Sequence, residues 1–352
     1  MKKLLPVVCA LGLFLNSFTS QTWAKEIQEP ENVNITKSKI ISPKEKVKSV
    51  KKTSKHHKKS NKNTEEVEIE QVKKPEEVLQ YVVLPLKEEV NIQLTARRAI
   101  LVDGKTGQVL FEKDAELPWH PASTTKVMSA LLILENGKLE DITTVSTSAT
   151  ALYGGYYSNW LSPGMKFTID QLLHILLIES DNASCNTLAE YLDGTQEKFV
   201  ERMNRRAQEL GLKSHFMTPY GMTHDLHYVS AKDLYLITKE AMKYPAFREI
   251  VRTPVYHIST PYMEHSFRNR NQFIGVDPRV LGVKTGYTSA AQCNLVCYAE
   301  DGEHSLYTVV MGSPRRDGDY SYPDSKKLLD YGFKILKEAP RIPVTIDQQA
   351  KL

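Results

Sequence analysis

Apolar and polar residues follow each other in an order that predicts a hairpin, several helices, a group of strands and a final helix. Two apolar runs, residues 97–103 and 108–113, flank the turn sequence Gly-Lys-Thr-Gly and predict a β-hairpin. Helical patterns follow and cover residues 123–137, 167–180, 182–194, 197–211 and 230–244. Strand-like runs then cover residues 253–259, 293–300 and 305–312, before a last helical pattern at residues 322–338.

Signals at the helix ends agree with these boundaries. Gly137 is placed as a C-terminal cap. Thr168 and Gln171 have the spacing of a capping box, and Ser230 precedes Asp233 at the same spacing. The order of elements predicts one α/β domain over residues 93–338, with an antiparallel sheet whose strands come from both ends of the chain. Residues 339–352 are predicted to form only a short tail.

The first 24 residues have the pattern of a secretory signal peptide. Two lysines precede an apolar run, and Ala24 follows as a small residue at which cleavage is expected. The alternative is a retained membrane anchor, but the apolar run is shorter than the roughly 20 residues that a membrane span needs. The sequence therefore predicts an exported protein.

Residues 25–92 are rich in lysine and glutamate and poor in aromatic residues, within a chain of 352 residues whose formal charge is +4. Such a segment buries too little apolar surface to offset the entropy of ordering, so we expect a disordered tether. Its lysines either serve solubility or attract the segment weakly to anionic wall polymer or membrane. Nucleic acid is not an expected partner of an exported protein.

Three cysteines remain after the signal segment, Cys185, Cys293 and Cys297. The last two lie four residues apart in a predicted strand, about 13 Å, whereas bridged Cα atoms are roughly 5.5–6 Å apart. We expect no structural disulfide and expect all three to be buried apolar residues.

The first helical segment begins with a hydroxyl and an amine, Ser123 and Lys126. Residues three apart lie on one face of a helix, so the amine can reach the hydroxyl. The apolar run after Lys126 favours burial, which lowers a lysine pKa and allows the amine to act as a base toward a serine nucleophile. On this motif alone an ordinary helix N-cap at Ser123 is the more common interpretation, and Ser49 and Lys52 repeat the spacing in the tether.

Two further motifs change this balance. Ser180-Asp181-Asn182 ends the second predicted helix, and Lys284-Thr285-Gly286 directly precedes a predicted strand. A second hydroxyl and an amide can relay protons and hold a carbonyl, and a lysine with a threonine can bind a carboxylate. An earlier copy, Lys105-Thr106-Gly107, lies in the predicted hairpin turn and is attributed to turn formation.

Ser-x-x-Lys, Ser-x-Asn and Lys-Thr-Gly in this order resemble the motif set of penicillin-binding proteins and serine β-lactamases. The text between the motifs resembles one branch, the low-molecular-mass D-alanyl-D-alanine carboxypeptidases of peptidase family S11. The resemblance covers residues 94–338. It implies a β-lactamase/transpeptidase-like α/β fold, with an antiparallel sheet flanked by helices and a helical subdomain.

The resemblance also implies roles for single residues. Ser123 attacks the carbonyl between two D-alanines of a peptidoglycan stem peptide, Lys126 is its base, and Ser180 passes the proton to the departing D-alanine. Asn182 holds the substrate backbone, Lys284 and Thr285 orient its carboxylate, and the N–H groups of Ser123 and Tyr287, the latter beside Gly286, form the oxyanion hole. β-Lactam antibiotics are then expected to acylate Ser123.

Some positions depart from the pattern of the branch. Asp181 stands where glycine is more usual, and Asp319 stands where an arginine often binds the substrate carboxylate. Arg268, Arg315 and Arg316 are therefore only candidates for that arginine. An additional C-terminal β domain and an anchor, which many relatives carry, are not expected here, as in shorter members that include D,D-endopeptidases.

Other functions have less support in the sequence. A class A β-lactamase is not expected, because no Leu-Asn pair of the Glu-x-x-Leu-Asn type follows the signal region. The complete motif set argues against a non-catalytic wall-binding scaffold. The same motifs would serve a D,D-endopeptidase, which therefore stays open as an alternative. His224-Asp225-Leu226-His227 offers no complete ligand set, so neither a metal nor another cofactor is expected.

Overall fold

The computed structural model describes residues 80–83, 92–151, 158 and 160–344. The predicted signal peptide and most of the predicted tether lie outside the described residues. The tether range includes strand β1 (Gln80–Val83), which pairs with β11 (Arg341–Val344) in the range predicted as a tail. Both of these ranges therefore contain a strand that the sequence did not indicate.

A five-stranded antiparallel sheet organises the domain, in the order β3-β2-β10-β9-β8. The predicted hairpin is confirmed as β2 and β3, and it pairs with the late strand β10 as expected for strands from both ends of the chain. The strands are β2 (Arg98–Asp103), β3 (Val109–Lys113), β8 (Val280–Thr288), β9 (Gln292–Asp301) and β10 (His304–Ser313).

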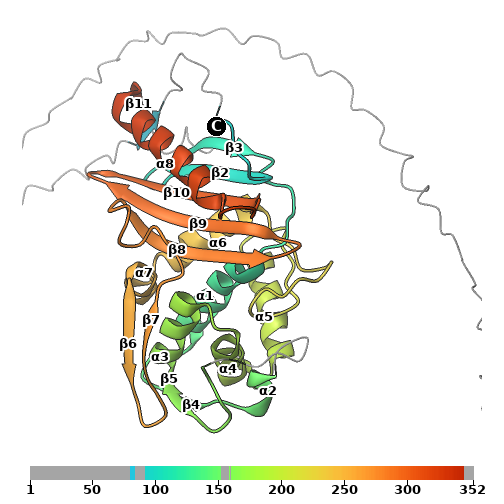
Figure 1. Ribbon diagram of the computed structural model, residues 1–352. Coiled ribbons are helices and arrows are strands. Elements are labelled where there is room, and N and C mark those ends of the chain that lie inside the picture. Colours follow the sequence, from blue (N-terminus) through green and yellow to red (C-terminus); the bar gives the residue numbers. More distant parts are fainter. Residues whose placement is uncertain (1–79, 84–91, 152–157, 159, 345–352) are drawn as a thin grey trace, which may run out of the picture. The chain divides into compact units, whose positions relative to one another are not determined.

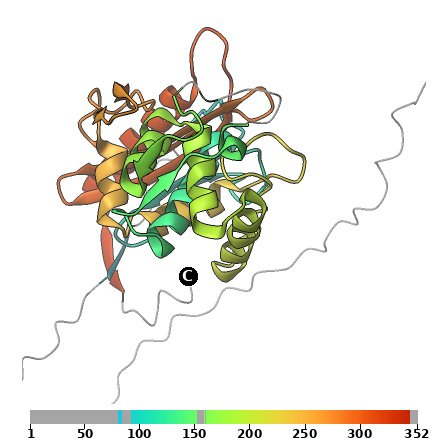
Figure 2. The same cartoon turned by 90° about the horizontal axis from the view of Figure 1, so that it is seen from below.

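Helices lie on both sides of this sheet (Figure 1). Helix α8 (Ser321–Glu338) packs on one face against β9 and β10, and α6 (Ala231–Ala241) packs on the other against β10 and β2. Seen from below, the remaining helices form a layer over that second face (Figure 2). They are α1 (Lys126–Asn136), α2 (Thr147–Thr150), α3 (Ile169–His174), α4 (Asn182–Asp193), α5 (Gln196–Glu209) and α7 (Pro245–Arg252).

Two apolar cores follow from this arrangement. One lies between the sheet and α8 and contains Leu101, Leu306 and Phe333, and the other joins the opposite face to the helical region. β10 is buried on both faces, which explains its almost continuous apolar sequence. α1 is buried along most of its length, so a polar side chain at its start is enclosed by the second core.

Local capping agrees with the sequence. Thr168 and Gln171 make both bonds of a capping box at the start of α3, and the Ser230 hydroxyl accepts a bond from Asp233 N. The helix predicted at 167–180 is shorter and begins after β5 (Lys166–Thr168), which pairs with β4 (Ile142–Thr144); a π turn, Ile175–Glu179, completes it. A second hairpin, β6 (Val255–Ser259) and β7 (Glu264–Arg268), was predicted only in its first strand.

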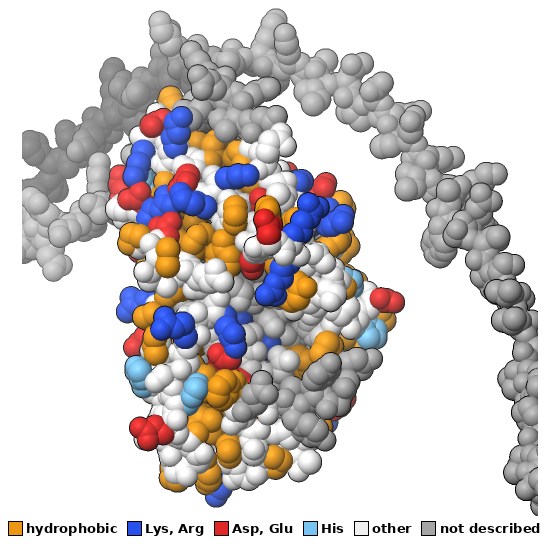
Figure 3. Space-filling view, viewed as in Figure 1, with side chains coloured by type: hydrophobic (Ala, Val, Ile, Leu, Met, Phe, Trp, Pro, Cys, Tyr) orange, Lys and Arg blue, Asp and Glu red, His pale blue; other side chains and the backbone are white. Residues whose placement is uncertain are grey.

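The surface of the domain carries both signs of charge. Lys and Arg side chains gather over the upper half of the face in Figure 3, where Figure 1 draws the five-stranded sheet. Within the described residues, we find no helix that combines the length and the apolar character needed to cross a membrane.

Candidate active site

Ser123 lies in a single 3-10 turn, Ala122–Thr125, that leads directly into α1. The N-cap positions are Pro121 for the turn and Thr125 for the helix, and neither side chain makes a capping bond. Ser123 Oγ instead accepts a hydrogen bond from Lys126 Nζ at 3.0 Å. The interpretation of Ser123 as an ordinary helix N-cap is therefore wrong.

Lys126 is completely buried at the start of α1. Its ammonium group donates to Ser123 Oγ at 3.0 Å, to Asn182 Oδ1 at 2.7 Å and to the Tyr220 carbonyl at 3.2 Å. Burial lowers the pKa of Lys126 to about 8, because the charged form loses its hydration. Roughly a tenth of the amine is then neutral at pH 7, with a lone pair available to the Ser123 proton.

The second motif joins two helical segments. Ser180 ends the π turn in the left-handed region, with φ of 67°, and the Asp181 carboxylate caps α4 by accepting from Ser184 N at 2.7 Å. Asn182 is consequently the first residue of α4, and its amide oxygen reaches Lys126. The buried Asp181 also accepts from Ser158 Oγ at 2.8 Å, and burial raises its pKa.

The third motif precedes the predicted strand, now β9, and itself lies within the edge strand β8, which the sequence did not indicate. Lys284 is buried, and its Nζ donates to the Thr285 carbonyl at 3.1 Å. Burial, together with repulsion from Lys126, holds the pKa of Lys284 well below its usual value. The positive charge of Lys126 therefore disfavours a second charge on Lys284.

Gly286 brings β8 into backbone contact with the turn that carries Ser123. A Cβ added to this glycine would lie 2.9 Å from Pro121 O and 3.0 Å from Ser123 N. Because any side chain would push the two backbones apart, glycine at this position sets how closely Tyr287 and Ser123 approach each other.

A cleft of about 350 Å³ opens in front of these groups. Five of the predicted site residues line it, namely Ser123, Ser180, Thr285, Gly286 and Tyr287. The other three lie behind the lining: Lys126 is bonded to Ser123 and Asn182, and Lys284 is bonded to Thr285. The structure thus brings together all eight residues, although three separate segments of the chain supply them.

The candidate arginines separate in the structure. Arg315 lines the cleft, with its guanidinium carbon 4.5 Å from the centre of the Tyr287 ring. Arg316 and Arg268 line other hollows. Arg270, which the sequence reasoning missed, also lines the cleft and forms an ion pair with Glu179. Two guanidinium groups therefore line the cleft, and one of them is paired with Glu179.

A polar side chain in β9 fixes the serine turn to the sheet, and sequence reasoning missed it. Asn294 Nδ2 donates to the carbonyls of His120 and Pro121, both at 2.9 Å, and its Oδ1 accepts from Gly312 N at 2.9 Å. The available signal was a lone amide within an otherwise apolar strand. Its complete burial with all bonds satisfied identifies it as a structural support of the site.

The opposite side of the serine turn is held by residues 219–227. His227 is buried and its Nε2 lies 3.1 Å from Thr125 Oγ1, while its Nδ1 accepts from Met217 N at 3.3 Å. This pattern makes Nε2 the protonated nitrogen, and burial lowers the His227 pKa to about 3. Gly221, with φ of 90°, allows the backbone to pass close to Ala122.

Neither the three cysteines nor the earlier copy of the Lys-Thr-Gly tripeptide lines the cleft. Cys185, Cys293 and Cys297 are free and buried. Lys105-Thr106-Gly107 forms the β2–β3 turn, in which Asp103 accepts from Lys105 N at 3.0 Å and from Thr106 Oγ1 at 2.6 Å. No group of three or more potential metal ligands occurs in the part of the chain that the structure describes.

A family model described as D-alanyl-D-alanine carboxypeptidase, peptidase S11, matches residues 85–315. The chain belongs to this family. It is 34% identical over 255 residues to the D-alanyl-D-alanine carboxypeptidase DacF of Bacillus subtilis, which covers 70% of this chain and 64% of DacF. The chain is 33% identical to DacA of Escherichia coli, and the match covers 70% of this chain and 62% of DacA. The chain therefore spans less than two thirds of the length of these two S11 relatives.

Solved structures of similar proteins show which fold this chain shares. The crystal structure of the Streptomyces K15 DD-transpeptidase matches with a TM-score of 0.65 at 26% identity, covering 70% of this chain and 99% of that one. A D-alanyl-D-alanine carboxypeptidase from Mycobacterium tuberculosis H37Rv matches with a TM-score of 0.66 at 30% identity, covering 75% and 100%. This S11 chain therefore has the predicted transpeptidase-like fold, with a five-stranded antiparallel sheet and helices.

Proposed function

We propose that this chain is a serine D-alanyl-D-alanine carboxypeptidase that trims the stem peptides of peptidoglycan through an acyl-enzyme at Ser123. One observation carries the proposal. A completely buried amine, Lys126 Nζ, lies 3.0 Å from the hydroxyl of Ser123 in a cleft walled by Thr285, Gly286 and Tyr287. The membership of the chain in the S11 family supports the same reaction.

Acylation begins with the neutral form of Lys126, which removes the hydroxyl proton as Ser123 Oγ attacks the carbonyl carbon between two D-alanines. The developing oxyanion accepts hydrogen bonds from the N–H groups of Ser123 and Tyr287. Gly286 supports this role, because it allows β8 to approach the serine turn closely. Loss of one such donor typically costs about 10²–10³ in rate.

Collapse of this intermediate breaks the carbon–nitrogen bond, and Ser180 passes a proton to the amine of the departing D-alanine. Ser180 suits the role because it lines the cleft together with Ser123. A water molecule then attacks the ester, releases the shortened peptide and restores the Ser123 hydroxyl. Each half-reaction needs a base that takes up a proton and later returns it. Lys126 can do both near neutral pH, because its pKa is about 8.

Substrate binding falls to the groups around this centre. Asn182 lies 2.7 Å from Lys126 through its Oδ1, which leaves the amide nitrogen for the substrate backbone. Lys284 and Thr285 orient the terminal carboxylate from strand β8, and Arg315 adds a guanidinium on the same side as Tyr287. Neither a metal nor another cofactor takes part.

A penicillin tests this proposal directly, since its strained amide reacts with the same serine. Intact-mass measurement should show one long-lived penicilloyl adduct, located on Ser123 by peptide mapping, and the Ser123→Ala variant should show none. Release of D-alanine from a synthetic pentapeptide should follow the same pattern. A chain that formed neither adduct nor product would be a non-catalytic wall-binding scaffold.

Cleavage of cross-links as a D,D-endopeptidase is the second candidate. The catalytic cleft shares Glu179, Arg270 and Gln272 with a neighbouring hollow lined by Trp160 and His265, so a longer branched peptide has room beside the cleft. Digestion of purified cell wall followed by chromatography of the fragments separates the two activities. Export, indicated by the signal-peptide pattern, would place either activity in the cell envelope.

A further inference from the structure

A second hollow, of about 440 Å³, opens beside the loop that follows β10. It shares no lining residue with the catalytic cleft, yet the two are close, because Arg315 lines the cleft and the next residue, Arg316, lines the hollow. Its volume falls within the range of small-ligand sites, roughly 300–1,000 Å³.

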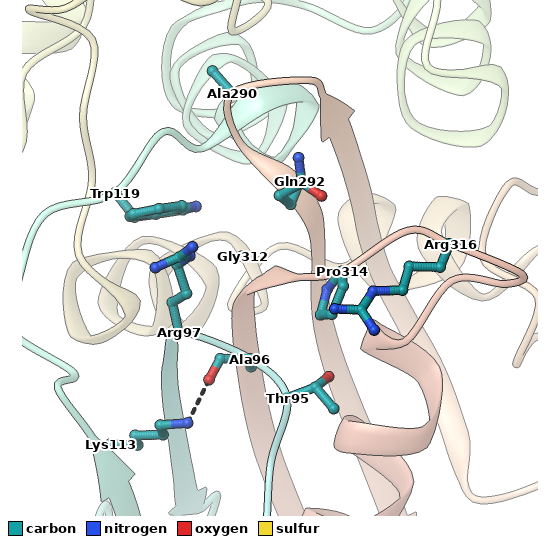
Figure 4. A pocket seen from close by; sticks show the side chains of 10 residues that line it. All are labelled: Thr95, Ala96, Arg97, Lys113, Trp119, Ala290, Gln292, Gly312, Pro314 and Arg316. Carbon is teal, nitrogen blue, oxygen red and sulfur yellow. Dashed lines mark hydrogen bonds between the residues drawn. The ribbon is translucent and has the colours of Figure 1, made fainter.

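The hollow is cationic. Arg97, Lys113 and Arg316 line it, and none of its ten lining residues is acidic. Figure 4 shows Arg97 and Arg316 on opposite sides of the hollow, with Gln292 above and Thr95 below. A small anion entering between the two arginines would meet a guanidinium group on each side.

Several contacts hold these groups in position. The guanidinium carbon of Arg97 lies 5.2 Å from the centre of the Trp119 ring, and Trp119 Nε1 donates to Ala291 O at 2.8 Å. Lys113 Nζ donates to Leu94 O at 3.1 Å and to Ala96 O at 2.7 Å, which keeps its charge beside the hollow.

Gln292, at the start of β9, is fixed in an unusual conformation. Its φ is 57°, in the left-handed region that non-glycine residues rarely adopt, and its Nε2 donates to Ser289 O at 2.6 Å. Backbone strain of this kind persists only where the surrounding structure determines it. On one side of the hollow the rim is formed by Arg97, packed near Trp119, and by Gln292. Arg316 completes the rim on the other side, and both arginines are exposed.

We propose that this hollow is a second binding site, specific for a carboxylate or phosphate group carried by the same polymer as the peptide cleaved at Ser123. Guanidinium groups bind such oxyanions in a bidentate manner, and two of them approach from opposite sides. The edge strand β8 continues from Tyr287 into the turn that contains Ala290, which lines the hollow. A peptide lying along this edge therefore extends from the cleft toward the hollow.

The identity of the polymer rests on the proposed function, whereas the anion specificity rests on the hollow alone. A bound anion here lies outside the reacting centre, so the site adds affinity for polymeric substrate without changing the chemistry of Ser123. Short peptides and penicillin, which end within the cleft, do not use it.

The test compares two full-length variants of equal charge. Arg97→Gln/Arg316→Gln removes two cations from the hollow, and Lys198→Gln/Arg205→Gln removes two exposed cations from α5, which contributes no lining residue. Co-sedimentation measures binding to insoluble peptidoglycan at low salt, and fluorescent penicillin measures the acylation rate of Ser123. Thermal unfolding checks that both variants are folded, and Arg97→Lys/Arg316→Lys should recover part of the binding.

We expect binding to peptidoglycan to weaken roughly tenfold in the hollow variant and less than twofold in the α5 variant, with acylation unchanged in both. Equal losses in the two variants, or slower acylation in the hollow variant alone, would overturn the proposal. If the hollow variant still binds phosphate-free peptidoglycan more weakly than the wild type, and this difference vanishes after amidation of the carboxyl groups, the bound group is a carboxylate. If the hollow variant binds more weakly only to wall polymer that bears phosphate, the bound group is a phosphate. Failure of the wild-type chain to acylate would contradict the proposed function but leave the binding result interpretable.

Discussion

A Cβ added to Gly286 would lie 3.0 Å from the backbone nitrogen of Ser123, so the edge strand β8 and the turn Ala122–Thr125 are in direct backbone contact. This contact also involves Pro121 O, at 2.9 Å from the same Cβ. A side chain at position 286 would force the strand and the turn apart. The distance between the backbones of Ser123 and Tyr287 therefore depends on the absence of a methyl group at position 286.

Replacing Gly286 with alanine should slow penicillin acylation of Ser123 by about 10²-fold, because a displacement of 1 Å at a reacting centre has consequences of this order. Thermal unfolding should change little by comparison. Gly318→Ala is the matched control, since a Cβ added there has nothing within 4 Å. An acylation rate for Gly286→Ala equal to that of the control would show that the strand does not position the serine.

The acylation rate should depend on pH through Lys126. Its pKa of about 8 means that the neutral fraction of the amine rises from about 1% at pH 6 to about a tenth at pH 7 and about half at pH 8, and then approaches saturation. Stopped-flow measurement of penicillin acylation between pH 6 and 10 checks this profile. A rate that is constant over the range would exclude Lys126 as the base, and Lys126→Met should remove both the profile and most of the activity.

Asn294→Ala should destabilise the domain and slow acylation together. The substitution leaves the carbonyls of His120 and Pro121 and the N–H of Gly312 without their partner, at a cost of about 3 kcal/mol in the free energy of unfolding. Urea unfolding measures the loss. Asn136→Ala, which removes one partly buried bond to Leu132 O, should cost less than about 1 kcal/mol.

Acidification should destabilise the domain through His227. Burial lowers its pKa to about 3 in the folded chain, while the unfolded chain takes up the proton near pH 6.5. The unfolded state therefore binds more protons between these values, and the free energy of unfolding falls by up to about 1.4 kcal/mol for each pH unit below 6.5. Urea unfolding at pH 7 and pH 5 should show a drop of about 2 kcal/mol from this residue.

His227→Gln should remove much of that dependence, because glutamine cannot take up the proton. His257→Gln, at an exposed position in β6, serves as the control and should leave the dependence on pH unchanged. A variant at position 227 that lost stability on acidification as steeply as the wild type would assign the effect to other groups.

The elements that the sequence predicted correctly are those whose pattern is local. Thr168 with Gln171 and Ser230 with Asp233 cap helices through bonds within one turn, and the hairpin of β2 and β3 joins neighbouring runs. β7 and α7 were missed because charged residues interrupt their apolar pattern. The pairing of β1 with β11 joins segments too far apart in the chain for local patterns to reveal.

Local sequence named part of the cleft, because Ser123 with Lys126, Ser180 with Asn182, and Lys284 with Thr285 form three short motifs that are recognisable as a set. It did not reveal the roles of Asn294 and His227, which support the serine turn through contacts with distant segments, or of Arg270, which lines the cleft and pairs with Glu179. The burial that lowers the pKa of Lys126 and the closeness of Gly286 to Ser123 arise when the edge strand packs against the serine turn. Only the tertiary structure decides such properties, because dielectric environment and distance belong to the packed chain and not to any one segment.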